Sequence, residues 1–335
     1  MLKKFLFTLL SALLTVGSVS AQTVNGAGAS FPYPIYSSWA HNYAAATKIQ
    51  INYQSIGSGG GIKEIIAGTV DFGASDDPLT SADLRKDNLI QIPVIVGGIV
   101  PVINLDGVAE GKLQLSPKVL ADIFHGKITK WNDPVIVAMN KGVKLPNEQI
   151  SVVYRSDSSG TSAVFTTFLS QVSKEWKDEI GAGKSVNWPV GMGAKGNDGV
   201  AGNVKRIKNS IGYVEYAYAK NNKITWTALT NTAGKLIQPN MESFQAAAAS
   251  ANWDKNADYY LWLVNAPGDK SWPIAAASFI LLRKDQPEKS AAAAKFFNWC
   301  FDNGDKAAEQ LVYVPLPKSL KDSVRGYLKE NGIKF

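Results

Sequence analysis

The chain has 335 residues, of which 45% are hydrophobic and 19% are charged, and it carries a formal net charge of +7. These values fit a globular protein with room for two domains, and they exclude a disordered chain of low hydrophobicity and high charge. The lysines are spread along the sequence and no RNA- or DNA-binding motif is present, so we expect no nucleic-acid partner. A modest positive charge is compatible with an anionic ligand. The one cysteine, Cys300, excludes an intrachain disulfide.

Residues 1–21 have the pattern of a cleavable secretory signal peptide. Two lysines precede an apolar run over 5–16, and small residues occupy the cleavage positions at 19–21. The alternative is a membrane anchor, but the run is shorter than the roughly 20 residues that a membrane span needs. Gln22, and not cysteine, follows the expected cut. We therefore expect an exported chain without a lipid anchor.

Short β-branched runs alternate with stretches of helical apolar spacing along the chain. The predicted strands cover 49–56, 70–75, 92–105 and 150–156. The predicted helices cover 61–69, 117–126 and 162–176, and the alternation continues through 210–219, 277–284 and 290–304. This order predicts an α/β fold with mixed, mostly parallel sheets.

Two long apolar strands, 92–105 and 275–283, are candidates for crossings between two lobes. If the chain leaves the first lobe at one and returns at the other, residues 22–103 and 275–335 form a discontinuous first lobe. Residues 104–274 then form the second lobe. A two-lobed α/β protein binds its ligand in the cleft, at the carboxyl ends of strands.

Hydroxyl side chains and glycines gather at three predicted helix starts. In the segment RSDSSGTSAVF, the residues Ser159, Gly160 and Thr161 stand just before a run with helical apolar spacing. Free backbone N–H groups and the positive end of the helix dipole attract anions at such a start. Ser58 lies in a Gly-rich turn before a second helix, and Ser30 is predicted to be the N-cap of a third.

Each of these starts has an ordinary explanation when taken alone, because Ser and Thr are common helix caps that contribute ~1 kcal/mol. Three of them together would converge on one tetrahedral oxyanion if two lobes close. The Gly-rich turn at 59–61 matches neither the P-loop nor the dinucleotide fingerprint, so it does not indicate a nucleotide site.

Asp76 ends a predicted strand, where its carboxylate would repel a bound anion. The contact becomes favourable if the anion carries a proton, as phosphate does near neutral pH and sulfate does not, because the carboxylate then accepts that hydrogen bond. The alternative is that Asp76 and Asp77 cap the following turn. Arg155 supplies a fixed cation and Asp157 is placed to hold it, with a surface ion pair as the alternative.

The sequence shows no pair of a nucleophile and an activating base, which a hydrolase would require. The two histidines, His41 and His125, lie outside the motifs above. The sequence has no nucleophile elbow, HExxH segment, cysteine pair or cluster with metal-ligand spacing. We therefore expect no catalysis, no metal and no cofactor.

Taken together, these segments resemble the family of periplasmic phosphate-binding proteins that serve phosphate-specific ABC transporters. The resemblance covers roughly residues 24–320 and rests on GAGASFPYPIYSSWA, NYQSIGSGGGIKEIIAGTVDFGASDDPL, VVYRSDSSGTSAVFT and GNDGVAGNVKRIKNSIGYVEYAYAK. It implies a type II periplasmic binding fold, with two lobes that close on one phosphate. It also implies capture of inorganic phosphate in the periplasm by a monomer, which delivers it to a membrane permease pair and its ATPase.

The resemblance also implies which residues bind the ligand. It assigns phosphate contacts to Ala29, Ser30, Phe31, Ser58, Asp76, Arg155, Ser159, Gly160 and Thr161, with Asp157 supporting the arginine. The chain departs from the family pattern in having Ser30 where threonine is frequent and Ser158 where glycine is common. The alternative functions are a binding protein for another oxyanion, such as sulfate or molybdate, and a secreted phosphatase-like protein.

Overall fold

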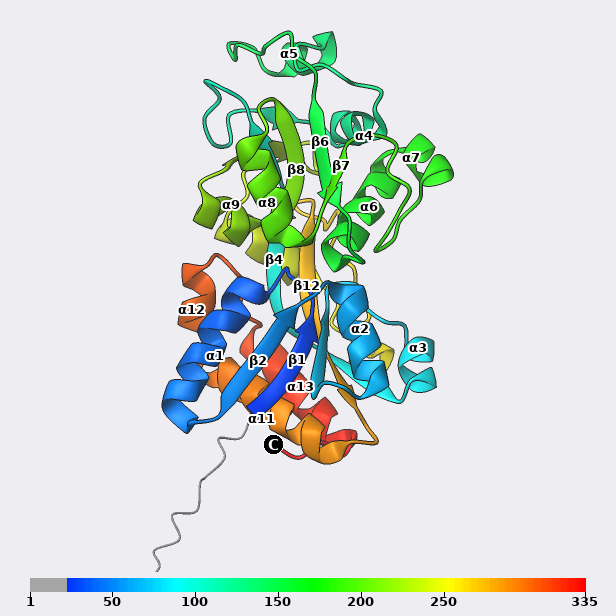
Figure 1. Cartoon of the computed structure of the whole chain (residues 1–335), viewed down its shortest axis with the longest axis vertical. Coiled ribbons are helices and arrows are strands. Elements are labelled where there is room, and N and C mark those ends of the chain that lie inside the picture. The colour runs from blue at the N-terminus through cyan, green and yellow to red at the C-terminus, as the bar shows by residue number, and fades with distance from the viewer. Residues whose placement is uncertain (1–22) are drawn as a thin grey trace, which may run out of the picture.

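The structure is a computed structural model of the whole chain, and it describes residues 23–335. The expected signal peptide, residues 1–21, lies outside the described residues. Figure 1 shows two halves, one above the other, that are joined in the middle by the long strands β4 (Leu89–Asn104) and β12 (Ala275–Arg283). Within 23–335, no helix is both long enough and apolar enough to cross a membrane.

The first half, at the bottom of Figure 1, is built on three strands that pair in parallel. These strands are β1 (Thr23–Gly28), β2 (Gln50–Ser55) and β3 (Phe72–Ser75). The helices of this half are α1 (Tyr33–Thr47), α2 (Ser58–Ala67), α3 (Ser81–Lys86), α11 (Pro287–Asn303), α12 (Asp305–Gln310) and α13 (Lys318–Glu330). Aromatic side chains fill the space between its sheet and helices, for example Tyr36 packed edge-on against Phe297.

The second half also has a parallel core, in which β6 pairs with both β7 and β8. These strands are β6 (Ser151–Arg155), β7 (Met192–Ala194) and β8 (Ser210–Glu215). The helices of this half are α4 (Pro117–His125), α5 (Pro134–Met139), α6 (Gly160–Val172), α7 (Lys174–Glu179), α8 (Gly196–Arg206) and α9 (Tyr216–Asn222). The remaining elements are β5 (Gln114–Leu115), β9 (Thr225–Trp226), β10 (Ala228–Thr230), β11 (Leu236–Ile237), α10 (Met241–Ala249) and the 3-10 helix η1 (Lys255–Ala257).

The two joining strands make the sheet continuous between the halves. The strand order is β2-β1-β3-β12-β4-β8-β6-β7, with β9 paired to β4. Strand β4 pairs antiparallel with β12 up to Gly98 and antiparallel with β8 from Ile99 onward, so it changes partner at that step. The predicted α/β class with two crossing strands is therefore confirmed. The sheet is mixed because the pairings inside each half are parallel and those of the joining strands are antiparallel.

Two predicted helix boundaries are wrong. Helix α1 begins at Tyr33 after Pro32, so Ser30 is not its N-cap. The predicted helix over 162–176 is two helices, because Ser173 has an extended backbone and accepts a hydrogen bond from the N–H of Trp176, which starts α7. Trp176 is fully buried, as the apolar spacing predicts, although the helix breaks between Val172 and Lys174.

Candidate functional site

The site lies where the two halves meet. Helix α2 packs against β1 and β3 there, and its first residue bonds to the first residue of α6. Ser58, the first residue of α2, accepts hydrogen bonds through Oγ from the N–H of Asp76 at 3.2 Å and from the N–H of Gly160 at 3.1 Å. The first donor belongs to the first half and the second to the second half. Ser58 is fully buried, so this bridge is closed to solvent.

Glycine at position 160 permits this close approach. A Cβ atom added to Gly160 would lie 2.2 Å from Ser58 Oγ and 2.9 Å from the backbone N of Asp76. A backbone atom cannot move aside as a side chain can, so any larger residue would push the halves apart. The predicted residues Ser58, Asp76 and Gly160 are thus brought together by the fold.

Asp76 is almost completely buried, at 2% exposure. Its Oδ1 accepts a hydrogen bond of 2.8 Å from Ser278 Oγ on β12, and its Oδ2 has no partner among the described residues. Burial raises the pKa of this carboxyl to about 7, although the Ser278 hydrogen bond and the Arg155 charge act in the opposite direction. The unpaired Oδ2 can accept a hydrogen bond from an O–H group of a ligand.

The alternative that Asp76 caps the following turn is not supported by its contacts. Ser75 performs that role, because its Oγ accepts from the N–H of Asp77 at 3.1 Å and donates to the carbonyl of Asp77 at 2.7 Å. The carboxylate of Asp77 forms an ion pair with Lys184 of the second half. The two neighbouring acids therefore have different surroundings: Asp77 pairs with a lysine, and Asp76 has a buried oxygen without a partner among the described residues.

Arg155 is 3% exposed and forms a two-pronged pair with Asp157. Arg155 Nε donates to Oδ1 at 2.8 Å and Nη2 donates to Oδ2 at 2.6 Å, while Nη1 is buried with no partner within 23–335. Burial alone would raise the pKa of Asp157, but the hydrogen bonds and charge of Arg155 outweigh it and hold the pKa below its ordinary value. The side chains of Arg155 and Asp157 are only 1% and 10% exposed, so this is not a surface ion pair.

The start of α6 has the predicted arrangement. Ser159 is the N-cap, and its Oγ accepts from the N–H of Ser162 at 3.0 Å, so the hydroxyl proton is left for another acceptor. Thr161 is buried, and its Oγ1 accepts from Nδ2 of Asn197 at 3.1 Å. The N–H of Thr161 has no hydrogen-bond partner among the described residues, as expected for the second residue of a helix.

The turn between β1 and α1 positions Ala29, Ser30 and Phe31. The N–H of Ala29 already donates to the carbonyl of Ala74 at 3.0 Å, so it has no donor left for a ligand. The N–H of Phe31 has no partner in the part of the chain that the structure describes, and the Phe31 carbonyl accepts from Tyr313 Oη at 2.7 Å. All three residues are buried at the junction.

Ser30 has a partner that the sequence analysis did not identify. Its Oγ accepts from Nδ2 of Asn197 at 2.8 Å and from the backbone N of Asn197 at 3.2 Å. Its carbonyl accepts from Tyr218 Oη at 2.7 Å. Asn197 stands in GND at a helix start, which is the same signal as the three starts described above. Ser278 could have been noticed as a polar residue inside an otherwise apolar strand.

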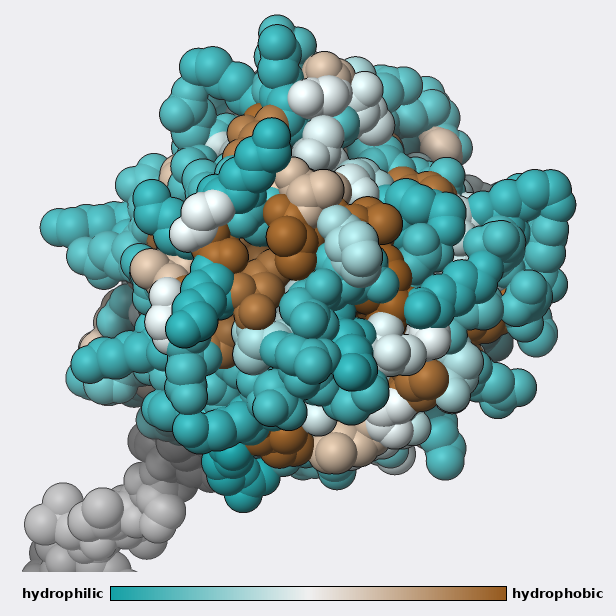
Figure 2. Space-filling model, turned by 90° about the horizontal axis from the view of Figure 1, so that it is seen from above, coloured by the Kyte–Doolittle hydropathy of each residue, from teal (hydrophilic) through white to brown (hydrophobic). Residues whose placement is uncertain are grey.

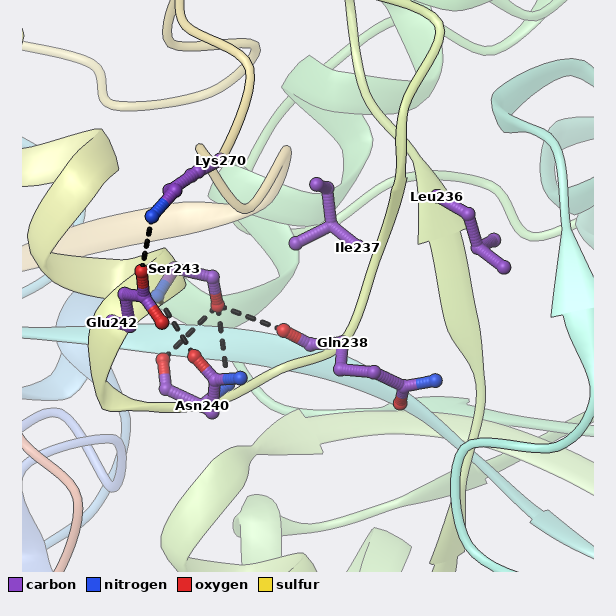
Figure 3. Close-up of a pocket in the computed structure, with 7 residues that line it drawn as sticks. All are labelled: Leu236, Ile237, Gln238, Asn240, Glu242, Ser243 and Lys270. Atoms are coloured by element: carbon purple, nitrogen blue, oxygen red, sulfur yellow. Dashed lines mark hydrogen bonds and ion pairs between the residues drawn. The ribbon is translucent and has the colours of Figure 1, made fainter.

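An open surface pocket elsewhere does not compete with this site. Figure 3 shows it, lined by Leu236, Ile237, Gln238, Asn240, Glu242, Ser243 and Lys270. Its polar groups are paired with one another, since Lys270 Nζ lies 2.6 Å from Glu242 Oε1 and Ser243 Oγ donates to the Gln238 carbonyl at 2.9 Å. None of the predicted ligand-binding residues lies in it.

The site at the junction is therefore rich in donors. It combines hydroxyl groups, free helix-start N–H groups and the Nη1 group of one guanidinium, and Asp76 Oδ2 is a buried carboxylate oxygen without a partner among the described residues. Such a set fits a small oxyanion with several bare oxygens and one proton. It has no histidine: His41 is exposed on α1, and His125 lies 3.0 Å from Glu179 on the far side of the second half.

Known proteins are similar to this chain in sequence and in fold. The PBP superfamily domain matches residues 15–303. The phosphate-binding protein PstS of Pasteurella multocida (strain Pm70) is 54% identical over 314 residues, which are 93% of this chain and 91% of that protein. Its counterpart in Haemophilus influenzae (strain ATCC 51907 / DSM 11121 / KW20 / Rd) is 53% identical over 322 residues, 95% of this chain and 96% of that one.

The solved structure of a phosphate-binding protein from Stenotrophomonas maltophilia has the same fold. It superposes with a TM-score of 0.70 at 23% identity and covers 91% of this chain and 93% of its own. Sequence and fold thus agree with the resemblance carried by the motifs. The chain belongs to the PBP superfamily and, within it, to the PstS family of phosphate-binding proteins.

Proposed function

We propose that this protein captures inorganic phosphate at the junction between its two halves, through the residues described above. One observation carries the proposal: Asp76 Oδ2 and Arg155 Nη1 are both buried and both unpaired at one site. A buried polar atom without a hydrogen-bond partner costs about 1–3 kcal/mol, so a donor and an acceptor left unpaired at one place point to a ligand that pairs with both. A protonated phosphate supplies an acceptor oxygen to Arg155 and an O–H donor to Asp76.

The same pairing explains why phosphate is preferred over sulfate. Sulfate has no proton to donate, so its oxygen would face the Asp76 carboxylate directly. A site built around a hydrogen bond rejects an analogue that lacks it by ~10⁴–10⁵-fold. The family consists of substrate-binding proteins and not of enzymes, so capture requires no reaction.

The test is isothermal titration of the purified mature chain, first with phosphate and then with sulfate. We expect one phosphate per chain and a dissociation constant for sulfate that is at least about a thousandfold higher. Binding of sulfate as tight as that of phosphate, or turnover of a phosphate ester, would contradict the proposal. Molybdate, added as a third ligand, tests the remaining oxyanion alternative.

In the cell, this function places the protein in the periplasm, where residues 1–21 would be removed during export. The two lobes would be residues 22–103 with 275–335, and residues 104–274. N-terminal sequencing of the protein recovered from the periplasm tests the first point, and we expect Gln22 as the first residue.

Delivery requires a partner, which in this family is the permease pair of the phosphate importer with its ATPase. Figure 2 views the α5 end of the molecule and shows apolar surface surrounded by polar side chains. Val135 and Val137 of α5 are exposed apolar residues, at 50% and 44%. We propose this end as part of the contact with the permease, which crosslinking from position 135 would test.

A further inference from the structure

Asn197 connects the two halves at the site although no motif marked it as a ligand residue. It is the second residue of α8 and is fully buried. Its Nδ2 donates to Ser30 Oγ of the first half at 2.8 Å and to Thr161 Oγ1 of the second half at 3.1 Å. Its backbone N–H donates to the same Ser30 oxygen at 3.2 Å.

The orientation of the Asn197 amide is fixed by a fourth contact. Its Oδ1 accepts a hydrogen bond of 2.9 Å from the backbone N–H of Glu215. A backbone N–H can only donate, so the oxygen must face Glu215 and the NH₂ group must face the two hydroxyls. The asparagine therefore presents donors, and no acceptor, to Ser30 and Thr161.

This arrangement determines the direction of the Ser30 hydroxyl. A serine hydroxyl has one O–H donor and two acceptor lone pairs. At Ser30, Asn197 donates to the oxygen twice, so both lone pairs are occupied. The remaining capacity is donation of the O–H proton. The hydroxyl of Ser58 is likewise left only to donate, because the backbone N–H groups of Asp76 and Gly160 occupy its two lone pairs.

We propose that Asn197 is a positioning residue that makes the hydroxyl of Ser30 an obligate donor to the bound oxyanion and biases that of Thr161 in the same direction. This inference rests on the proposed function and extends it to the recognition of individual oxygens. A ligand oxygen beside Ser30 must be bare, because a protonated one would meet a hydroxyl that cannot accept. The ligand's proton is thereby directed away from Ser30 and toward an acceptor such as Asp76 Oδ2, which is buried without a partner among the described residues.

Asn197 also ties recognition to contact between the halves. Ser30 belongs to the turn after β1 and Asn197 to the start of α8, 167 residues apart in the chain. The hydroxyl therefore acquires its fixed direction only when the halves touch. A hydroxyl on a separated half is free to donate or to accept, and it selects less strictly.

The test is a pair of double-mutant cycles measured by phosphate titration. We expect Asn197→Ala to raise the dissociation constant for phosphate by roughly 10- to 100-fold, since it removes two buried hydrogen-bond donations. The same change in a Ser30→Ala background should cost clearly less, because only one of the two hydroxyls that Asn197 contacts, Thr161, remains. In a Ser58→Ala background it should keep its full cost, because backbone groups direct Ser58.

Matched controls separate this role from a general loss of structure. Asn203→Ala, on the same helix α8 and in contact with Arg206, should leave phosphate affinity unchanged. If Asn197→Ala lowers the melting temperature too far for titration, Asn197→Leu replaces it in both cycles, because leucine fills a similar volume and carries no donor or acceptor.

Equal cost of the Asn197 change in all three backgrounds, or no cost in any of them, overturns the inference. Failure of the unmutated protein to bind phosphate overturns the proposed function instead. The two failures are distinguishable, because the first is measured with the Asn197 variants and the second with the unmutated protein.

Discussion

Gly160→Ala tests the contact between the halves with one added methyl group. In this structure that methyl carbon would lie 2.2 Å from Ser58 Oγ and 2.9 Å from the backbone N and the Cβ of Asp76. The serine could rotate, but the Asp76 backbone could not, so the halves must separate by a fraction of an ångström or more. The hydrogen bond from the Gly160 N–H to Ser58, at 3.1 Å, would lengthen as they do.

The expected magnitude follows from these two losses. Overpacking costs about 1–3 kcal/mol and a buried hydrogen bond about 1 kcal/mol. Their sum, about 2–4 kcal/mol, falls on the state in which the halves touch, which corresponds to a phosphate affinity lower by roughly 30- to 1000-fold. Folding of the second half should not suffer, because the atoms that the added methyl group would meet, on Ser58 and Asp76, belong to the first half.

Isothermal titration gives the affinity, and the melting temperature of the protein without phosphate reports folding. Gly202→Ala is the matched control, because the residue lies in α8 and an added Cβ would meet nothing within 4 Å. We expect it to bind phosphate like the unmutated protein. Unchanged affinity of the Gly160→Ala variant would refute the argument that binding requires this contact.

Three further predictions concern the charged groups. Asp76→Asn should reduce the preference for phosphate over sulfate by at least about tenfold in competition titration, since the charge that repels sulfate is removed; an unchanged preference would assign selectivity elsewhere. Because the pKa of Asp76 is about 7 in the folded protein and lower in the unfolded chain, folding is favoured at low pH, and the free energy of unfolding should fall by up to about 4 kcal/mol as the pH rises from 4 to 7. Burial also raises the pKa of Glu215, which therefore contributes to the same dependence of stability on pH. Melting curves of the unmutated protein and of Asp76→Asn, measured across this pH range, separate the two contributions. If stability falls equally with pH in both proteins, Asp76 does not cause the fall. Lys184→Ala removes the ion pair with Asp77 between the halves and should speed phosphate release by about two- to fivefold in stopped-flow measurements, whereas Lys174→Ala, whose partner lies on its own helix, should have no effect.

Much of the fold could be predicted because it depends on local patterns. The predicted strand over 92–105 corresponds to β4 and the predicted helix over 117–126 to α4, since apolar spacing determines which face is buried. The break at Ser173 could not be predicted from that spacing, because Phe165, Phe168 and Trp176 are all buried and continue one apolar pattern across it. Only the backbone conformation of Ser173 separates the two helices.

Some contacts of the candidate site residues could be predicted and others could not, and the reason is related. Ser159 caps α6 and Asp157 holds Arg155, both within a few residues of their partners, so local chemistry was sufficient. Ser30 was taken for a cap because it precedes a proline-rich helix start, but a partner 167 residues away binds its hydroxyl. Ser278 was overlooked since its partner Asp76 lies 202 residues away. Contacts set by tertiary packing leave little trace in a single sequence.

The two halves depend on each other for the definition of the site. The first half contributes Asp76 with an unpaired oxygen, and the second contributes Arg155 with an unpaired N–H. Contact between them fixes the direction of the hydroxyls but also leaves the Asp76 oxygen and the Arg155 Nη1 group buried without partners, which opposes the contact by about 1–3 kcal/mol for each group. A protonated oxyanion removes that penalty by pairing with both groups, so it binds the joined state more tightly than the separated one. Selectivity and closure are then one effect, because a ligand that cannot satisfy Asp76 also cannot stabilise the contact that directs Ser30 and Ser58.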